Sequence, residues 1–125
     1  MAERTKNVLV VEDDEELRNT LVNALARAGF GAFGASSVRE ARSKLRNQKF
    51  ACLLFDIHLG DERADEVIAE LRGLRSHPNA DTPIIVVSGH LDRDLIGSIR
   101  AHVQGALVKP FRLDAVLEAV KRVAG

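Results

Sequence analysis

Four short apolar segments of this chain end at polar residues that could do chemistry, and this repetition is its most informative feature. The segments are 8–11, 51–55, 84–87 and 106–108, and the residues that follow them are Glu12, Asp13, Asp56, Ser88 and Lys109. Apolar segments without alternation, separated by helix-length stretches, are typical of parallel strands covered on both faces. Because the carboxyl ends of parallel strands share one edge of the sheet, we expect three carboxylates, a hydroxyl and an ammonium to meet there.

Three crowded carboxylates are unfavourable unless a proton or a cation compensates their charge. Mg²⁺ suits such a site because it takes oxygen ligands and keeps several waters. A carboxylate can also act as a nucleophile towards phosphorus, and the transferred group then needs its negative charge neutralised. Mg²⁺, Lys109 and Ser88 would each contact one of its oxygens. For the acidic residues 14–16 we favour the alternative that they are surface residues at the start of a helix.

The stretches between these segments carry the periodicity of amphipathic helices. Apolar residues recur at helical spacing over 17–28, 38–47, 67–74, 95–99 and 113–123, and 30–35 is the weakest of the strands. Gly29 suits a helix C-terminus, and Ser37 with Glu40 is typical of a capping box. Five βα units predict an α/β fold, a doubly wound (βα)5 three-layer sandwich with a five-stranded parallel sheet in the order 2-1-3-4-5. The first and third strands are then neighbours, so Glu12 and Asp13 face Asp56.

Composition narrows the functional classes. Eighteen basic residues balance eighteen acidic ones among 125 residues, which disfavours nucleic acid or an anionic membrane as a partner. Cys52 is the only cysteine, so no internal disulfide forms, and its apolar segment predicts a buried core position. Neither a signal peptide nor a spanning stretch is evident, so we expect a cytoplasmic protein. We also expect a single domain over 1–125, with no effector domain.

With these motifs in order, the chain resembles the receiver domain of two-component response regulators from Lys6 to about Val123. The resemblance depends on segments 10–14, 53–59, 83–89 and 107–111. It implies that Asp56 is the phosphoacceptor, Ser88 the switch hydroxyl and Lys109 the lysine that pairs with the phosphoryl group. It also implies a cis Lys109–Pro110 bond.

For the metal, Mg²⁺ or Mn²⁺, the resemblance implies Asp13 and Asp56 as direct ligands. It adds the backbone carbonyl of His58 as a ligand, and Glu12 acts through water.

The function implied is a phosphorylation-controlled signalling module of a two-component system or phosphorelay. A histidine kinase or a histidine phosphotransfer protein would donate the phosphoryl group to Asp56 in a Mg-dependent reaction, and water would later remove it. The module would catalyse these two steps on itself without being a multiple-turnover enzyme. A downstream target would bind the face of the fourth helix, fifth strand and fifth helix.

Two alternatives stay open. The first is a pseudo-receiver, a protein-interaction module that needs no phosphorylation. The second is a hydrolase with an aspartyl-phosphate intermediate, which the lack of an evident general acid or substrate-enclosing cap disfavours.

Two departures from the family pattern bear on the output. Ala106 stands where receivers usually have the aromatic residue that swings inward on activation, and alanine has no rotamer to switch. Segment 60–65 replaces the usual Pro and Gly-containing turn with a more acidic loop, for which we expect a different shape. The chemistry is thus expected to be complete, with an altered signal readout and a small conformational change that suits a phosphoryl carrier or sink.

Overall fold

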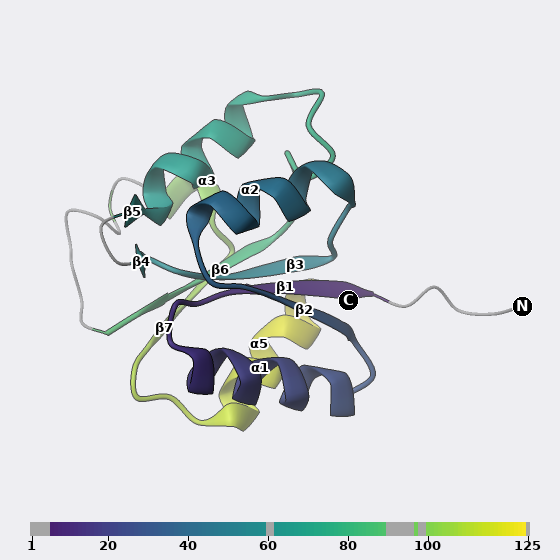
Figure 1. Ribbon diagram of the computed structural model, residues 1–125, viewed down its shortest axis with the longest axis vertical. Coiled ribbons are helices and arrows are strands. Elements are labelled where there is room, and N and C mark those ends of the chain that lie inside the picture. Colours follow the sequence, from purple (N-terminus) through teal and green to yellow (C-terminus); the bar gives the residue numbers. More distant parts are fainter. Residues whose placement is uncertain (1–5, 60–61, 90–96, 98–99, 125) are drawn as a thin grey trace, which may run out of the picture.

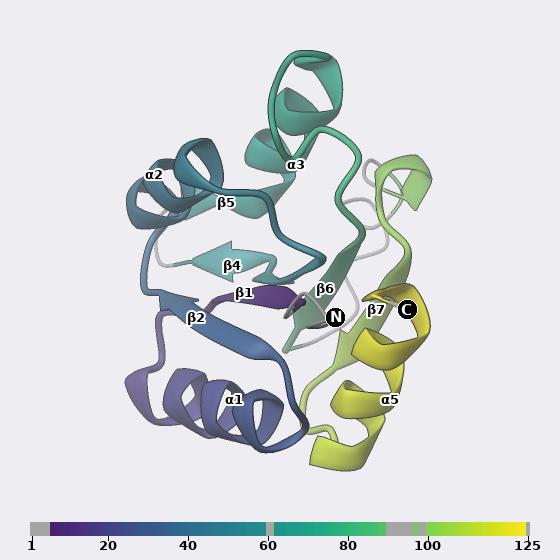
Figure 2. The same ribbon diagram turned by 90° about the vertical axis from the view of Figure 1, so that its right-hand side faces the viewer.

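A computed structural model of the chain describes residues 6–59, 62–89, 97 and 100–124, and these form three layers (Figures 1 and 2). The central sheet is parallel, in the order β2-β1-β3-β6-β7. Its strands are β1 (Asn7–Val11), β2 (Gly31–Ala35), β3 (Cys52–Asp56), β6 (Ile84–Ser88) and β7 (Gly105–Val108). The predicted (βα)5 sandwich and its 2-1-3-4-5 order are therefore confirmed.

Helices cover both faces of this sheet. In Figure 1, α2 and α3 lie above it, and α1 and α5 lie below it. The helices are α1 (Glu15–Arg27), α2 (Val38–Asn47), α3 (Ala64–Gly73) and α5 (Leu113–Ala124), with a 3-10 helix η1 (Arg100–His102). A helix was also expected over 95–99, but of these positions only residue 97 lies within the described residues. No helix in the described ranges combines the length and the apolar character that a membrane crossing needs.

Successive side chains of a strand point to opposite faces of the sheet, so alternate residues of the central strands pack into two separate cores. Leu9 and Val11 pack beneath α2 and α3, whereas Val8 and Val10 pack against α1 and α5. Cys52 belongs to the second core and is fully buried. Burial raises the pKa of its thiol to about 12, which confirms the predicted core role.

The helix ends follow the local sequence signals. Asp14 is the N-cap of α1, where its side chain accepts a hydrogen bond from the Leu17 N–H at 3.1 Å. After α1, Gly29 adopts a φ of 98°, a left-handed conformation that favours glycine. Ser37 caps α2 by accepting from the Glu40 N–H at 3.1 Å, but Glu40 Oε2 accepts from the N–H and Oγ of Ser36 rather than completing the capping box on Ser37.

Three features differ from the sequence predictions or were missed by them. Segment 106–108 was expected to be covered on both faces, but β7 is at a sheet edge and alternates in burial, with Val108 43% exposed. Leu74, assigned to the third helix, follows the last residue of α3 and is 53% exposed. A small antiparallel pair, β4 (His58–Leu59) and β5 (Glu62–Arg63), brackets residues 60–61, which lie outside the described part of the chain. The strand pair was not predicted, because each strand has only two residues.

One buried side chain, Asn79, organises the loop that leads into β6. Its Oδ1 accepts hydrogen bonds from the Phe50 N–H at 2.8 Å and from the Thr82 hydroxyl at 2.9 Å. Its Nδ2 donates to the carbonyls of Leu45 at 2.7 Å and Gln48 at 2.8 Å. These bonds close the C-terminal end of α2 and fix the chain that enters β3.

Candidate functional site

Two buried carboxylates lie at the carboxyl edge of the sheet. β1 and β3 are neighbours with Val11 opposite Phe55, so Glu12, which follows β1, and Asp56, the last residue of β3, come side by side. Glu12 is 2% and Asp56 5% exposed, whereas Asp13 is open to solvent. One oxygen of each of these three carboxylates lies within 4.8 Å of the others. The predicted acidic cluster is therefore present.

Lys109 supplies the cation of this site. Its Nζ donates to Glu12 Oε1 at 2.8 Å and to Asp56 Oδ2 at 3.1 Å. The residue reaches the carboxylates from the end of β7, and its backbone N–H donates to the Ser88 carbonyl at 2.7 Å. The Lys109–Pro110 bond is cis, as the family resemblance implied. Lys109 thus ties together the ends of β1, β3 and β7.

The electrostatics at Glu12 are dominated by burial. Removal of its carboxylate from water raises the pKa of Glu12 to about 7, and the nearby Asp13 and Asp56 add to this. Hydrogen bonds from Lys109 and from the Asp14 N–H, which donates to Oε2 at 3.1 Å, act in the opposite direction. In the absence of a further cation, Glu12 therefore gains or loses a proton near neutral pH.

At Lys109 the balance is reversed. Burial lowers the pKa of the ammonium, but the hydrogen bonds and charges of Glu12 and Asp56 outweigh this and raise the pKa above its ordinary value. Lys109 is therefore a fixed positive charge at physiological pH. When all three carboxylates are ionised, they and the one ammonium carry a net charge of two negative units, which a divalent cation would balance. The donor set consists of oxygen atoms, so a hard ion such as Mg²⁺ fits it.

Ser88 and His58 are the two remaining residues that the sequence analysis assigned to the site, and the structure places them in β6 and β4. Ser88 ends β6, is 3% exposed and follows Val87, which is paired with Asp56. His58 is in β4, two residues after Asp56. The Ile57 N–H between them donates to the Val87 carbonyl at 2.9 Å, which holds this segment against β6. Their roles towards phosphate and metal stay predictions.

Arg18 is a site residue that the sequence analysis missed. Arg18 lies in α1, and its Nη1 donates to the Glu12 carbonyl at 2.9 Å. The Glu12 N–H in turn donates to the carbonyl of Ala35, the last residue of β2, at 3.0 Å. The aliphatic part of Arg18 lies on Gly34, where a Cβ would come within 3.1 Å of the Arg18 Cδ. Arg18 and β2 thus hold the backbone that carries Glu12 and Asp13. A glycine inside β2 was the available signal, because it marks a close approach.

Comparison with known proteins agrees with this geometry. The model of the family described as "response regulator receiver domain" matches residues 8–121. This chain belongs to that family. Phosphorylation-controlled signalling in two-component systems is the family's function, and receiver domains act between histidine kinases and downstream effectors.

Three similar proteins illustrate the family relationship. Nodulation protein W of Bradyrhizobium diazoefficiens is 34% identical over 122 residues, which cover 92% of this chain and 51% of that protein. A receiver protein structure from Pseudomonas putida is 32% identical with a TM-score of 0.87, covering 97% and 99% of the two chains. A Burkholderia pseudomallei response regulator, solved with a phosphorylated aspartic acid, a calcium ion and citrate, is 28% identical with a TM-score of 0.81, covering 95% and 68%. The receiver spans about half the length of several curated relatives that it matches.

Proposed function

We propose that this receiver accepts a phosphoryl group on Asp56 from the phosphohistidine of a histidine kinase or a histidine phosphotransfer protein. The observation that carries the proposal is the Lys109 ammonium, which bridges Glu12 and Asp56 across the carboxyl edge of the sheet. An isolated surface carboxylate would need no such arrangement. A cytoplasmic location suits this function and the single, buried Cys52.

In the proposed reaction, an oxygen of Asp56 forms a bond to phosphorus while the bond between phosphorus and the donor's imidazole nitrogen breaks. The bonding electron pair stays on the leaving nitrogen. Lys109 exchanges its contact with Asp56 for one with a phosphoryl oxygen, and the Ser88 hydroxyl donates to another. Water later attacks phosphorus, which releases inorganic phosphate and restores the carboxylate. Little covalent chemistry is asked of the protein, so its contribution is positioning and charge neutralisation.

We further propose that Asp13, Asp56 and the His58 carbonyl hold Mg²⁺ or Mn²⁺, with Glu12 acting through water. When bound there, such an ion would supply positive charge that offsets the negative charge of the transferred phosphoryl group. The acidic cluster and its excess of two negative charges support this assignment. The Burkholderia relative, whose structure contains a phosphorylated aspartic acid and a calcium ion, is consistent with it.

The output is proposed to be that of a phosphoryl carrier or sink. Ala106 is exposed on β7 opposite Val86 and offers no aromatic ring to bury on activation. A ligand shifts a conformational equilibrium only through contacts that differ between the two states. A carrier needs only access to Asp56, so it tolerates this loss. A target on the face predicted for the fourth helix, fifth strand and fifth helix is the finer alternative, and it would require another switch residue.

A phosphotransfer assay with a small phosphodonor, with and without Mg²⁺, tests this function. The proposed switch or carrier is labelled once per molecule in a Mg-dependent manner and loses the label slowly. A pseudo-receiver, for which the exposed Ala106 is the one favourable observation, stays unlabelled. A hydrolase releases many equivalents of phosphate. Either of the last two results would overturn the proposal.

A further inference from the structure

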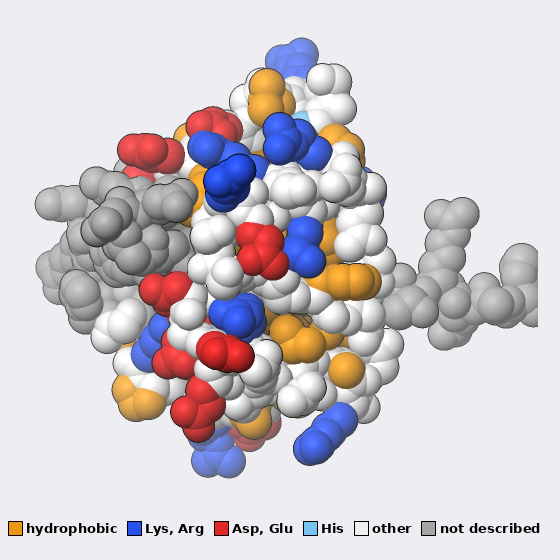
Figure 3. Space-filling model, in the orientation of Figure 1, with side chains coloured by type: hydrophobic (Ala, Val, Ile, Leu, Met, Phe, Trp, Pro, Cys, Tyr) orange, Lys and Arg blue, Asp and Glu red, His pale blue; other side chains and the backbone are white. Residues whose placement is uncertain are grey.

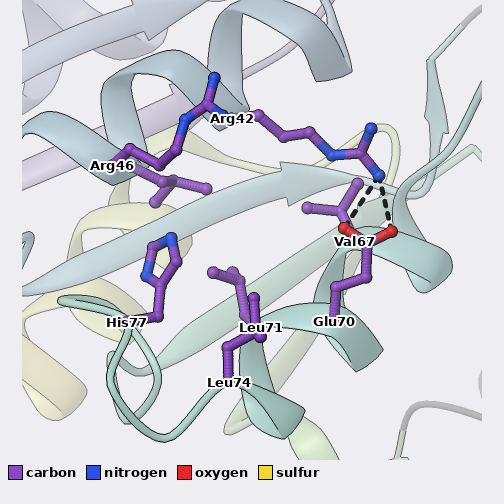
Figure 4. A pocket seen from close by; sticks show the side chains of 8 residues that line it. Arg42, Arg46, Val67, Glu70, Leu71, Leu74 and His77 are labelled. Carbon is purple, nitrogen blue, oxygen red and sulfur yellow. Dashed lines mark hydrogen bonds and ion pairs between the residues drawn. The ribbon is translucent and has the colours of Figure 1, made fainter.

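A recess lies between α2 and α3, away from the carboxyl edge of the sheet where Asp56 lies. Its volume is about 140 Å³, and its walls are apolar, formed by Leu45, Val67 and Leu71. Leu74 borders it and is 53% exposed (Figure 4). Cavities of roughly 150 Å³ lined by aliphatic residues can hold a benzene ring, so one leucine or phenylalanine side chain fits here.

Polar groups around this recess are mostly cationic or hydrogen-bond donors. Arg42 closes one side with a two-point ion pair to Glu70, at 2.8 and 2.9 Å (Figure 4). Arg46 is exposed and forms no ion pair within the described part of the chain. His77 accepts from the Asn79 N–H through Nδ1 at 3.0 Å, so in the neutral ring the proton is on Nε2, where it can be donated. The site therefore offers unused donors beside apolar walls.

The α2 side of the recess is basic, whereas α3 carries three acidic residues, Asp65, Glu66 and Glu70, against one basic residue, Arg72. Residues 38–49 include five basic residues, Arg39, Arg42, Lys44, Arg46 and Lys49, against one acidic residue, Glu40. Over the whole chain, basic and acidic residues are equal in number. Figure 3 shows Lys and Arg side chains over α2 and Asp and Glu side chains over α3, with some hydrophobic side chains among them. Because Arg42 is already paired with Glu70, Arg46 is the cation of this recess, among the described residues, that is left for a partner, which favours an acidic occupant.

We propose that this α2–α3 recess docks an acidic amphipathic helix of a partner protein. One apolar side chain of the helix inserts against Leu71 and Leu74, and a carboxylate one turn away pairs with Arg46. Amphipathic helices commonly bind apolar grooves in this way, and complementary charge selects among them. The recess includes the last turn of α2, which ends just before β3 begins, whereas Asp56 is at the far end of β3. Docking therefore leaves Asp56 accessible and does not depend on its phosphorylation.

Methyl chemical shifts of the full chain, titrated with three synthetic helical peptides, test the proposal. The peptides share one leucine spacing and differ only in whether their polar face carries Glu, Gln or Lys. We expect the Glu peptide to shift the methyl signals of Leu45, Val67, Leu71 and Leu74, and to bind on the order of tenfold more tightly than the Lys peptide. Arg46→Glu should remove or reverse this preference. Arg27→Glu, the same change at an exposed site in the last turn of α1, should leave it intact.

Three results would overturn the proposal. The first is that all three peptides leave these methyl signals unchanged or bind equally well. The second is a concentration-dependent dimer in light scattering that Arg46→Glu abolishes, which would make a second copy the occupant. The third is Arg46-dependent binding to phosphatidylserine vesicles without peptide binding, which would make the site a membrane contact. Because Asp56→Asn should bind the Glu peptide as well as the wild type, failure here is distinguishable from failure of phosphotransfer.

Discussion

The burial of Glu12 makes the stability of the metal-free receiver depend on pH near neutrality. The pKa of Glu12 rises from an ordinary 4.5 to about 7, so the folded protein binds this proton more tightly than the unfolded chain. The contribution of this proton binding to the free energy of unfolding is fully present below pH 4.5 and is lost as the pH rises through about 7. At about 1.4 kcal/mol for each pKa unit, the loss amounts to roughly 3 kcal/mol. Glu12→Gln has no proton to lose there and should escape this penalty.

The assay is urea unfolding in EDTA at a series of pH values. The unfolding free energy of the wild type should fall relative to that of Glu12→Gln by up to about 3 kcal/mol between roughly pH 4.5 and pH 8. Lys109→Ala tests whether Glu12 is the titrating group. Loss of the Lys109 hydrogen bond should raise the pKa of Glu12 and move the pH midpoint of the stability loss upwards. Added Mg²⁺ should reverse the loss, because it binds only the folded state. Parallel curves for wild type and Glu12→Gln would refute the reasoning.

Three further predictions concern the supporting residues. Lys109→Ala should leave Asp56 able to be phosphorylated but abolish the associated chemical-shift changes along β7 and α5; unchanged shifts relative to the wild type would contradict the bridging role. Arg18→Ala should weaken Mg²⁺ binding on the order of tenfold in calorimetry, because the Glu12 backbone loses its anchor, and full affinity would exclude that role. Asn79→Ala should lower the unfolding free energy by about 3 kcal/mol, since its buried partners are left unpaired, whereas the exposed Asn47→Ala should change it by less than about 0.5 kcal/mol.

The parts of the fold that could be predicted are those that depend on residues close together in the sequence. Apolar segments followed by polar residues gave the central strands, and connection rules left few strand orders, so Glu12, Asp13 and Asp56 could be placed together in advance. Gly29 and Ser37 marked helix boundaries through their own backbone preferences. The remaining assignments, such as the switch role of Ser88 and the His58 carbonyl as a metal ligand, depend on the family resemblance and stay predictions.

What escaped the sequence depends on contacts between distant residues. Asn79 read as part of a turn-rich loop, yet it joins the end of α2 to the entry of β3 through four hydrogen bonds. Arg72 likewise donates to the carbonyls of Ala80, Thr82 and His102, at 2.7 to 3.0 Å. No periodic pattern in the sequence marks either residue as a hydrogen-bonding centre. The alternating burial of β7 was missed because its residues 106–108 are all apolar, although the predicted strand order already placed the fifth strand at an edge of the sheet.

The most direct test of the central claim is the location of the phosphoryl group. After incubation with phosphoramidate and Mg²⁺, intact-mass measurement of the wild type should show one added phosphoryl group, and tandem mass spectrometry should place it on Asp56. Asp81→Asn, the same change at an exposed position before β6, should be labelled normally. Asp56→Asn should gain no mass; undiminished labelling of that variant would contradict the account.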